Sequence, residues 1–100
     1  MLKDWTHPRF VENQNTTFVV VHPQWGDVPV ELVSVSDLRE TARQRMFSLV
    51  FRGPFEQPLE QGLYPMTHAA LGTESLFLVP VGREADGFRY EAVFNNLVGG

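Results

Sequence analysis

Histidine is the residue type in this chain that could most readily hold a metal ion or move a proton. His7, His22 and His68 are at least fifteen residues apart, whereas neighbouring zinc ligands are usually about two to five residues apart. The chain contains no cysteine, which excludes thiolate metal sites, disulfides and a thiol nucleophile. We therefore predict no metal site, and interpret the three histidines as strand-end side chains that are exposed or hydrogen-bonded.

The other side chains that could catalyse a reaction lack the spacing that enzymes use. No G-x-S-x-G elbow is present for a serine nucleophile, and the glycines before residue 99 stand singly rather than in a phosphate-binding loop. Glu31, Glu74 and Glu91 occupy alternating strand positions, which predicts a solvated face rather than an acid–base pair. We predict that the protein is not an enzyme, has no catalytic residues and binds no cofactor.

Arginine is the one charged residue type that is locally concentrated. Arg39, Arg43 and Arg45 lie within seven residues, and Arg52 follows in the next predicted strand. Guanidinium groups can bind carboxylate or phosphate through two hydrogen bonds, so an anionic partner surface is one interpretation. The simpler interpretation is a solvated loop in which two nearby acidic residues offset most of the positive charge.

Two aromatic residues fall outside the predicted core. Trp25 lies in a turn, and Phe55 lies in the loop that follows Gly53-Pro54. Exposed aromatics can anchor a protein–protein interface; alternatively, both side chains fold back and close one end of a barrel. Together with the arginines, they define a possible partner surface of Trp25, Phe55, Arg52, Arg39, Arg43 and Arg45.

A β-hairpin between residues 76 and 95 is the element around which the rest of the chain is organised. Two apolar runs flank a short polar segment that ends in Asp86-Gly87, a dipeptide typical of tight turns. In the second run, aromatic and polar residues alternate, which predicts one buried and one solvated face. The first run, 76–81, has almost no polar position and predicts a strand covered on both faces.

Four further predicted strands extend this pattern to a mainly all-β fold. We predict six strands, at 16–22, 28–36, 46–52, 63–68, 75–82 and 88–95. Their spacing is typical of an antiparallel meander that forms a small barrel or a sandwich. The apolar alternation changes phase within 28–36, which indicates a β-bulge. The predicted core includes Phe47, Leu49, Phe51, Phe77, Val79, Tyr90 and Phe94.

Residues 1–100 are expected to form a single domain with two segments outside the strands. Residues 1–12 predict a short helical or irregular lid, with Trp5 and Phe10 against the barrel and Pro8 limiting its length. Residues 37–45 are the most polar stretch of the chain. They predict either a mobile loop or one to two helical turns begun by a capping box at Asp37 and Glu40.

Composition limits the classes of partner. The net charge is −4 and the chain has one lysine, which argues against nucleic acid because phosphate neutralisation needs clustered basic residues. No apolar run approaches about 20 residues, the length that spans a bilayer, and the N-terminus lacks the apolar segment of a signal peptide. We expect a cytoplasmic protein whose partner is another protein; the sequence leaves the oligomeric state open.

Three phrases in the chain carry a family resemblance: FSLVFRGP, PLEQGLYPMTHAALGTESLFLVPVGR and GFRYEAVFN, within residues 47–95. In this order they resemble a family of short bacterial proteins of about this length, catalogued as a domain of unknown function. Its members often lie near genes for phage-tail-like fibre or collar proteins. The resemblance implies no activity and favours a structural or interaction accessory module; the alternative is a β-barrel that binds a small ligand.

Overall fold

The computed structural model describes residues 5–97, which form one short helix and seven strands. In chain order, these are α1 (His7–Glu12), β1 (Thr17–His22), β2 (Gly26–Val35), β3 (Arg39–Glu40), β4 (Gln44–Gly53), β5 (Gly62–His68), β6 (Gly72–Glu84) and β7 (Gly87–Leu97). The six predicted strands are confirmed and correspond to the six long strands. No helix within residues 5–97 has the length and apolar content needed to cross a membrane.

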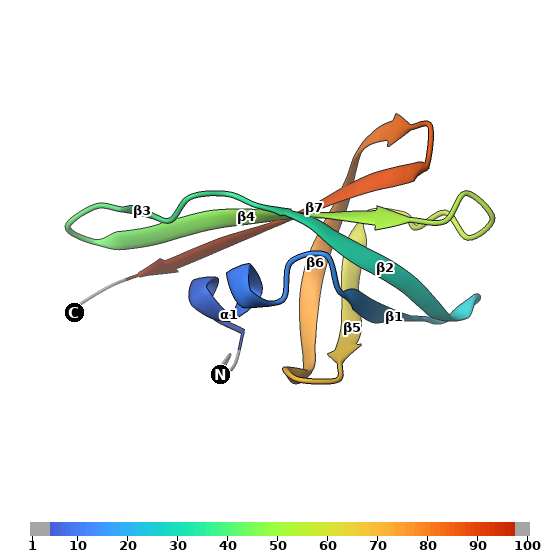
Figure 1. Ribbon diagram of the computed structural model, residues 1–100, viewed down its shortest axis with the longest axis horizontal. Helices are drawn as coiled ribbons and strands as arrows, with labels where there is room; N and C mark the ends of the chain where they lie inside the picture. Colours follow the sequence, from blue (N-terminus) through green and yellow to red (C-terminus); the bar gives the residue numbers. More distant parts are fainter. Residues whose placement is uncertain (1–4, 98–100) are drawn as a thin grey trace.

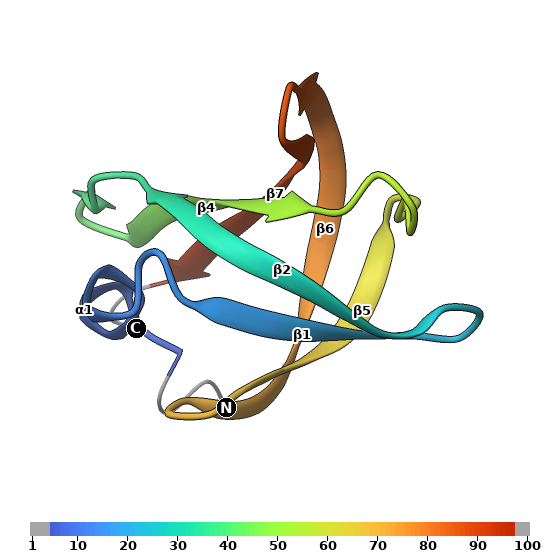
Figure 2. The same ribbon diagram turned by 45° about the vertical axis from the view of Figure 1, so that its right-hand side comes forward.

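The six long strands close into an antiparallel barrel (Figures 1 and 2). Their order is β2-β1-β5-β6-β7-β4, and pairing between β2 and β4 closes the ring. The predicted antiparallel β fold is confirmed, and it takes the form of a barrel. The chain makes two three-stranded meanders, β1-β2-β4 and β5-β6-β7, because β5 returns to pair with β1 rather than with β4.

Two register shifts bend the long strands. One lies in β2 between Leu32 and Ser34, where the strand pairs with β4, and it confirms the predicted bulge. The other lies in β6 between Pro80 and Gly82, shortly before the turn into β7. Such bulges increase local twist and allow a small barrel to close.

The barrel interior is filled by apolar and aromatic side chains, since alternate strand residues point inward. The buried residues are Trp5, Phe10, Phe18, Val20, Val28, Val30, Leu32, Phe47, Leu49, Phe51, Leu59, Tyr64, Met66, Leu71, Leu76, Leu78, Tyr90, Ala92 and Phe94. Among the described residues, no buried side-chain polar atom lacks a hydrogen bond.

The predicted core is wrong at two positions, both in β6. Phe77 is 49% exposed and Val79 is only partly buried, whereas Leu76 and Leu78 point inward. The strand therefore alternates and is not covered on both faces. Its apolar run contains no polar residue that would reveal which phase faces the core, so the two phases could not be distinguished by composition.

The predicted N-terminal helical segment is present as α1, which packs against the open end of the barrel (Figure 1). Phe10 is fully buried, and its ring lies 5.3 Å from the ring of Phe94 and 5.9 Å from that of Phe47. The indole N–H of Trp5 donates to the carbonyl oxygen of Leu71 at 2.8 Å. Pro8 lies in the first turn of α1, where its missing N–H costs no helical hydrogen bond.

The polar segment 37–45 forms a β-hairpin, so the helical interpretation is wrong. Arg39 pairs with Met46 and Glu40 pairs with Arg45. The hydroxyl of Thr41 accepts hydrogen bonds from the backbone N–H groups at positions 43 and 44. A hydroxyl that caps a turn in this way competes with helix formation, which explains why the acidic capping pattern does not start a helix.

Candidate functional site

The six residues of the predicted partner surface lie in two separate regions. Arg39, Arg43 and Arg45 belong to the β3–β4 hairpin at the beginning of β4, whereas Arg52 lies near its end. Arg52 lies seven positions after Arg45 along β4, roughly 23 Å at about 3.3 Å per residue. Figure 1 shows this hairpin and the β4–β5 loop at opposite ends of the molecule.

The arginine hairpin is exposed to solvent. Arg45 donates to the Glu40 carboxylate at 2.9 Å, with both side chains about half exposed, so this pair contributes little to stability. Among residues 5–97, no ion pair involves Arg39 or Arg43. A shallow depression of about 470 Å³ lies beside the hairpin and is lined by Ser36, Asp37, Arg39, Met46, Phe47, Ser48 and Val93.

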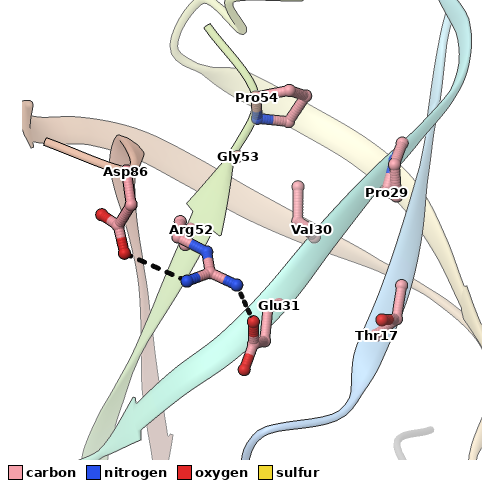
Figure 3. A pocket seen from close by; sticks show the side chains of 8 residues that line it. All are labelled: Thr17, Pro29, Val30, Glu31, Arg52, Gly53, Pro54 and Asp86. Carbon is pink, nitrogen blue, oxygen red and sulfur yellow. Dashed lines mark hydrogen bonds and ion pairs between the residues drawn. The ribbon is translucent and has the colours of Figure 1, made fainter. Parts of the chain in front are cut away.

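Arg52 is held by carboxylates from two other segments (Figure 3). Its Nη1 donates to Asp86 Oδ2 at 3.0 Å, and its Nη2 forms an ion pair with Glu31. Arg89 donates to the other oxygen of Asp86 at 2.9 Å. Hydrogen bonds from Arg89 and then Arg52 lower the pKa of Asp86 below its usual value. The bond to Asp86 and the charge of Glu31 raise the pKa of Arg52.

These ion pairs connect β2, β4 and the β6–β7 turn, so Arg52 joins parts of the barrel. An anionic partner that binds Arg52 would compete with the carboxylates of Glu31 and Asp86 for its N–H donors. The groove beside it, of about 320 Å³, is lined by Thr17, Pro29, Val30, Glu31, Arg52, Gly53, Pro54 and Asp86. Figure 3 shows the Arg52 guanidinium between the two carboxylates on one side of this groove.

Trp25 and Phe55 both fold back onto the barrel end. The indole N–H of Trp25 donates to the carbonyl oxygen of Pro58 at 3.0 Å, which links the β1–β2 turn to the β4–β5 loop. Phe55 packs edge to face against Phe88 at 5.3 Å, and the guanidinium of Arg83 lies 4.6 Å from its ring centre. Trp25 remains 38% exposed, so its outer face is still accessible.

All three histidines form hydrogen bonds; His22 and His68 lie at strand ends as expected, whereas His7 lies in α1 and is partly buried rather than solvated. His22 Nδ1 accepts from the backbone N–H groups of residues 24 and 25, both at 3.0 Å. His68 Nδ1 accepts from Ala70 N–H at 3.0 Å, which leaves Nε2 as the donor to the Thr16 hydroxyl at 2.9 Å. His7 Nε2 lies 2.8 Å from the Ser36 carbonyl oxygen.

Burial lowers the pKa of His68, and the nearby charge of Arg9 lowers it further. The neutral ring therefore persists in the fold and connects β5 to the segment that follows α1. In the part of the chain that the structure describes, no three His, Asp or Glu side chains are grouped so that they could hold a metal ion.

An exposed apolar surface that the sequence did not identify lies on the outside of β5 and β6. Leu63 and Phe77 are direct cross-strand partners, and they are 66% and 49% exposed. Val79 follows Phe77 on the same face and is partly buried. We call Leu63, Phe77 and Val79 the outer β5–β6 face. The sequence carries no signal for this face, because the apolar run 76–81 contains no polar residue that would show which side chains point outward.

The carboxylate of Glu91 borders the outer β5–β6 face, whereas Glu60 lies near the inward-facing Tyr64. Glu91 is the direct cross-strand partner of Val79, and Glu60 precedes Leu63 in the exposed loop before β5. No ion pair within residues 5–97 involves either carboxylate. The face therefore combines one aromatic and two aliphatic side chains with the unneutralised charge of Glu91 at its border.

A family model described as "Domain of unknown function (DUF6916)" matches residues 5–94. The match confirms the resemblance to a domain of unknown function and extends it from residues 47–95 to the N-terminal half. A search of the curated proteins and a search of the solved structures return no match.

Proposed function

We propose, for a chain that belongs to the DUF6916 family of domains of unknown function, a role as a small non-enzymatic module that binds another protein. The proposal places it in the bacterial cytoplasm as an interaction or structural accessory component. Phage-tail-like assemblies are the context that the family resemblance suggests. The function would then reside in a surface, and the barrel would serve to hold that surface rigid.

The exposed pair Leu63–Phe77 is the observation that supports this proposal most strongly. Two large apolar side chains paired directly across neighbouring strands expose 66% and 49% of their surface. Burial of apolar surface contributes about 25 cal/mol per Å², so covering this pair would favour association. Aromatic side chains on a rigid strand also lose little conformational entropy when they are bound.

The border of this face indicates the chemistry of its partner. The carboxylate of Glu91 borders the outer β5–β6 face beside Val79, and the chain as a whole carries a charge of −4. Complementary charge at the rim speeds association and disfavours wrong partners. We therefore expect a protein surface with an apolar centre that is bordered by lysine or arginine.

The alternative, a barrel that binds a small ligand inside, receives less support from the packing. Phe18, Phe51 and Leu49 are completely buried in the interior, together with other large side chains. A six-stranded barrel has little internal space even before its side chains are counted. An internal ligand would have to displace several of these side chains, whereas a protein partner needs no rearrangement of the core.

Site-specific photo-crosslinking in cells tests the proposal. A benzophenone amino acid at position 77 should capture a discrete protein, which mass spectrometry then identifies. The same probe at position 25 tests the loop end, and a probe at the exposed position 42 serves as the control. Capture should disappear in Leu63→Ser, which removes the neighbouring side chain. Capture from position 25 alone would move the interface to the loop end; no capture from either position would contradict the proposed function.

A further inference from the structure

The strands of the barrel extend beyond the residues that pair with the neighbouring strands. Parts of several strands therefore have one edge, here called a flank, without a neighbouring strand. β2 continues past its last pair with β4, which joins Glu31 to Arg52. β5 likewise continues past its last pair with β1, and β6 continues past its last pair with β5. Unpaired flanks matter because their free N–H and C=O groups can pair with another strand.

Proline removes a donor from three of these flanks. Leu32 N–H donates to the carbonyl oxygen of Thr16, the residue that precedes β1, and successive residues of a strand direct their backbone groups to opposite sides. The backbone nitrogen of Pro29 therefore faces away from β1, toward the side of β2 on which pairing with β4 has already ended. The same alternation can be followed from strand to strand through the residue pairs. It places the nitrogen of Pro65 in β5 on the side that faces β1, and the nitrogen of Pro80 in β6 on the side that faces β5, in both cases beyond the last residue pair. Proline at such positions protects an edge from unwanted pairing.

Among residues 5–97, the end of β7 has no neighbouring strand on one side and lacks this protection. The last pair between β6 and β7 joins Val79 to Glu91, while β7 continues to Leu97 and pairs with β4. Residues 92–97 (AVFNNL) contain neither proline nor a charged side chain. By contrast, the two residues of β3, at the other edge of the same sheet segment, are Arg39 and Glu40.

Hydrogen bonds on the far side of β4 show which backbone groups of β7 are free. Ser36 N–H donates to Ser48 O, and Thr41 N–H donates to Gln44 O. The even-numbered residues of β4 therefore face β2 and β3, and the odd-numbered residues face β7. Because Phe47 pairs with Phe94, the even-numbered residues of β7 bond to β4. The N–H and C=O groups of residues 93, 95 and 97 consequently point to the open side.

We propose that residues 93–97 of β7 pair with the same segment of a second copy of this chain. An antiparallel pair of identical strands is two-fold symmetric, which is the commonest symmetry of protein dimers. A register centred on Asn95 places it opposite its own copy, and places position 93 opposite position 97. In this register the backbone N–H and C=O groups of residues 93, 95 and 97 all point toward the second copy. No like charges meet in the paired segment, although the chain carries a net charge of −4.

The sheet of one copy would then continue into that of the other through β3-β4-β7. Val93, now 65% exposed beside Ser48 on the outer face, would gain apolar contacts across the symmetry axis. Figure 1 shows the end of β7 extending past α1. This surface is distinct from the outer β5–β6 face, so the inference does not depend on the proposed function.

Oligomeric state tests the inference directly. Sedimentation equilibrium over a wide concentration range should show a reversible dimer for the wild type. Asn95→Pro removes a donor on the open side without removing a hydrogen bond to β4, and should weaken the dimer at least tenfold. Val93→Lys, which replaces an exposed apolar side chain of the proposed interface by a charged one, should have the same effect and covers the case in which the proline also perturbs the strand. Val81→Lys, at another exposed valine (52%), is the control and should leave the dimer intact.

Amide hydrogen exchange supplies a second measurement on the same protein. Exchange at positions 93 and 95 should slow as the wild-type concentration rises, and should be independent of concentration in Val93→Lys. A wild type that is monomeric at all concentrations would overturn the inference. So would a dimer that neither Asn95→Pro nor Val93→Lys weakens, because its interface would then lie elsewhere.

Discussion

Gly87 crosses the backbone of Gly53 so closely that a Cβ at position 87 would overlap the Gly53 carbonyl oxygen. Gly87 also has φ +148°, which L side chains rarely adopt. Gly53 is constrained in turn, because a Cβ there would lie 2.8 Å from Cε2 of Tyr90. The Tyr90 hydroxyl accepts the Leu59 N–H at 2.9 Å. These contacts connect the β6–β7 turn, the end of β4 and the loop that follows it.

Gly87→Ala should therefore destabilise the barrel. The added methyl group combines a strained backbone conformation with a clash against rigid backbone, so the free energy of unfolding should fall by about 2–3 kcal/mol. Urea denaturation measures the loss. Gly82→Ala in the same hairpin is the matched control, because no atom lies within 4 Å of a Cβ there and its φ is not in the positive range. Equal effects of the two substitutions would contradict this account of the crossing.

Phe94→Ala should cost about 3–5 kcal/mol, the usual range for a buried aromatic. Phe94 is 6% exposed, stacks on Phe47 at 4.7 Å and contacts Phe10 of α1. Thermal and urea unfolding measure the loss. Phe77→Ala deletes the same side chain from the outer face and should cost less than about 1 kcal/mol, since only cross-strand contact is lost. A Phe94→Ala protein as stable as the Phe77→Ala protein would show that the core is packed differently.

The pKa of His68 makes stability depend on pH near neutrality. Because the folded pKa lies below the ordinary value of 6.5, the unfolded chain binds the proton more tightly. The contribution is thus fully present above pH 6.5 and is lost as the pH falls below it. Protonation would place a hydrogen on Nδ1, which faces Ala70 N–H, beside the positive charge of Arg9.

His68→Gln should reduce this dependence. Urea unfolding at pH 7.5 and 5.5 should show a smaller loss of stability on acidification in the variant than in the wild type. An NMR titration of the wild type should give a His68 pKa below 6.5. Identical pH dependence in both proteins would exclude His68 as the responsible group.

The pKa of Asp86 should show which of its two arginine partners stabilises the carboxylate more. Its pKa is lowered chiefly by the hydrogen bond from Arg89 and secondly by that from Arg52. NMR titration of the side-chain carboxyl carbon should therefore show a rise in pKa in both Arg89→Gln and Arg52→Gln, with the larger rise in Arg89→Gln. The stabilising effect of Asp86 is present above its ordinary pKa of 3.8 and is lost as the pH falls through the folded value. A larger rise in Arg52→Gln would reverse the assignment.

Local sequence signals predicted much of this fold because strand alternation and turn chemistry act over a few residues. The alternation in 88–95 correctly identified Tyr90 and Phe94 as buried, and Asp86-Gly87 marked the hairpin turn. The same reasoning was wrong at Phe77, where the apolar run has no polar residue to define its phase. It was also wrong for the helical interpretation of 37–45, where turn hydrogen bonds and pairing with β4 determine the conformation.

The candidate surfaces could not be predicted because they depend on which residues meet across paired strands and turns. Leu63 meets Phe77 only through the β5–β6 register, and Arg52 meets Asp86 only because the β6–β7 turn folds over the end of β4. Sequence spacing gives no information about either contact. The arginines show the opposite case. Their proximity in sequence suggested a single surface, but the length of β4 separates Arg52 from the arginines of the β3–β4 hairpin.

The β3–β4 hairpin should be the internal segment that proteases cut first. Its turn residues Thr41, Ala42 and Arg43 are all exposed, and β3 pairs with β4 through only two residue pairs. Segments with few buried contacts open locally at little cost in free energy. Brief trypsin treatment should therefore cleave after Arg43 before it cleaves after Arg89, whose side chain is 20% exposed and paired with Asp86. Mass spectrometry of the early fragments identifies the site. Slow amide exchange at positions 40–43, with first cleavage elsewhere, would show that the hairpin is held more firmly than its contacts indicate.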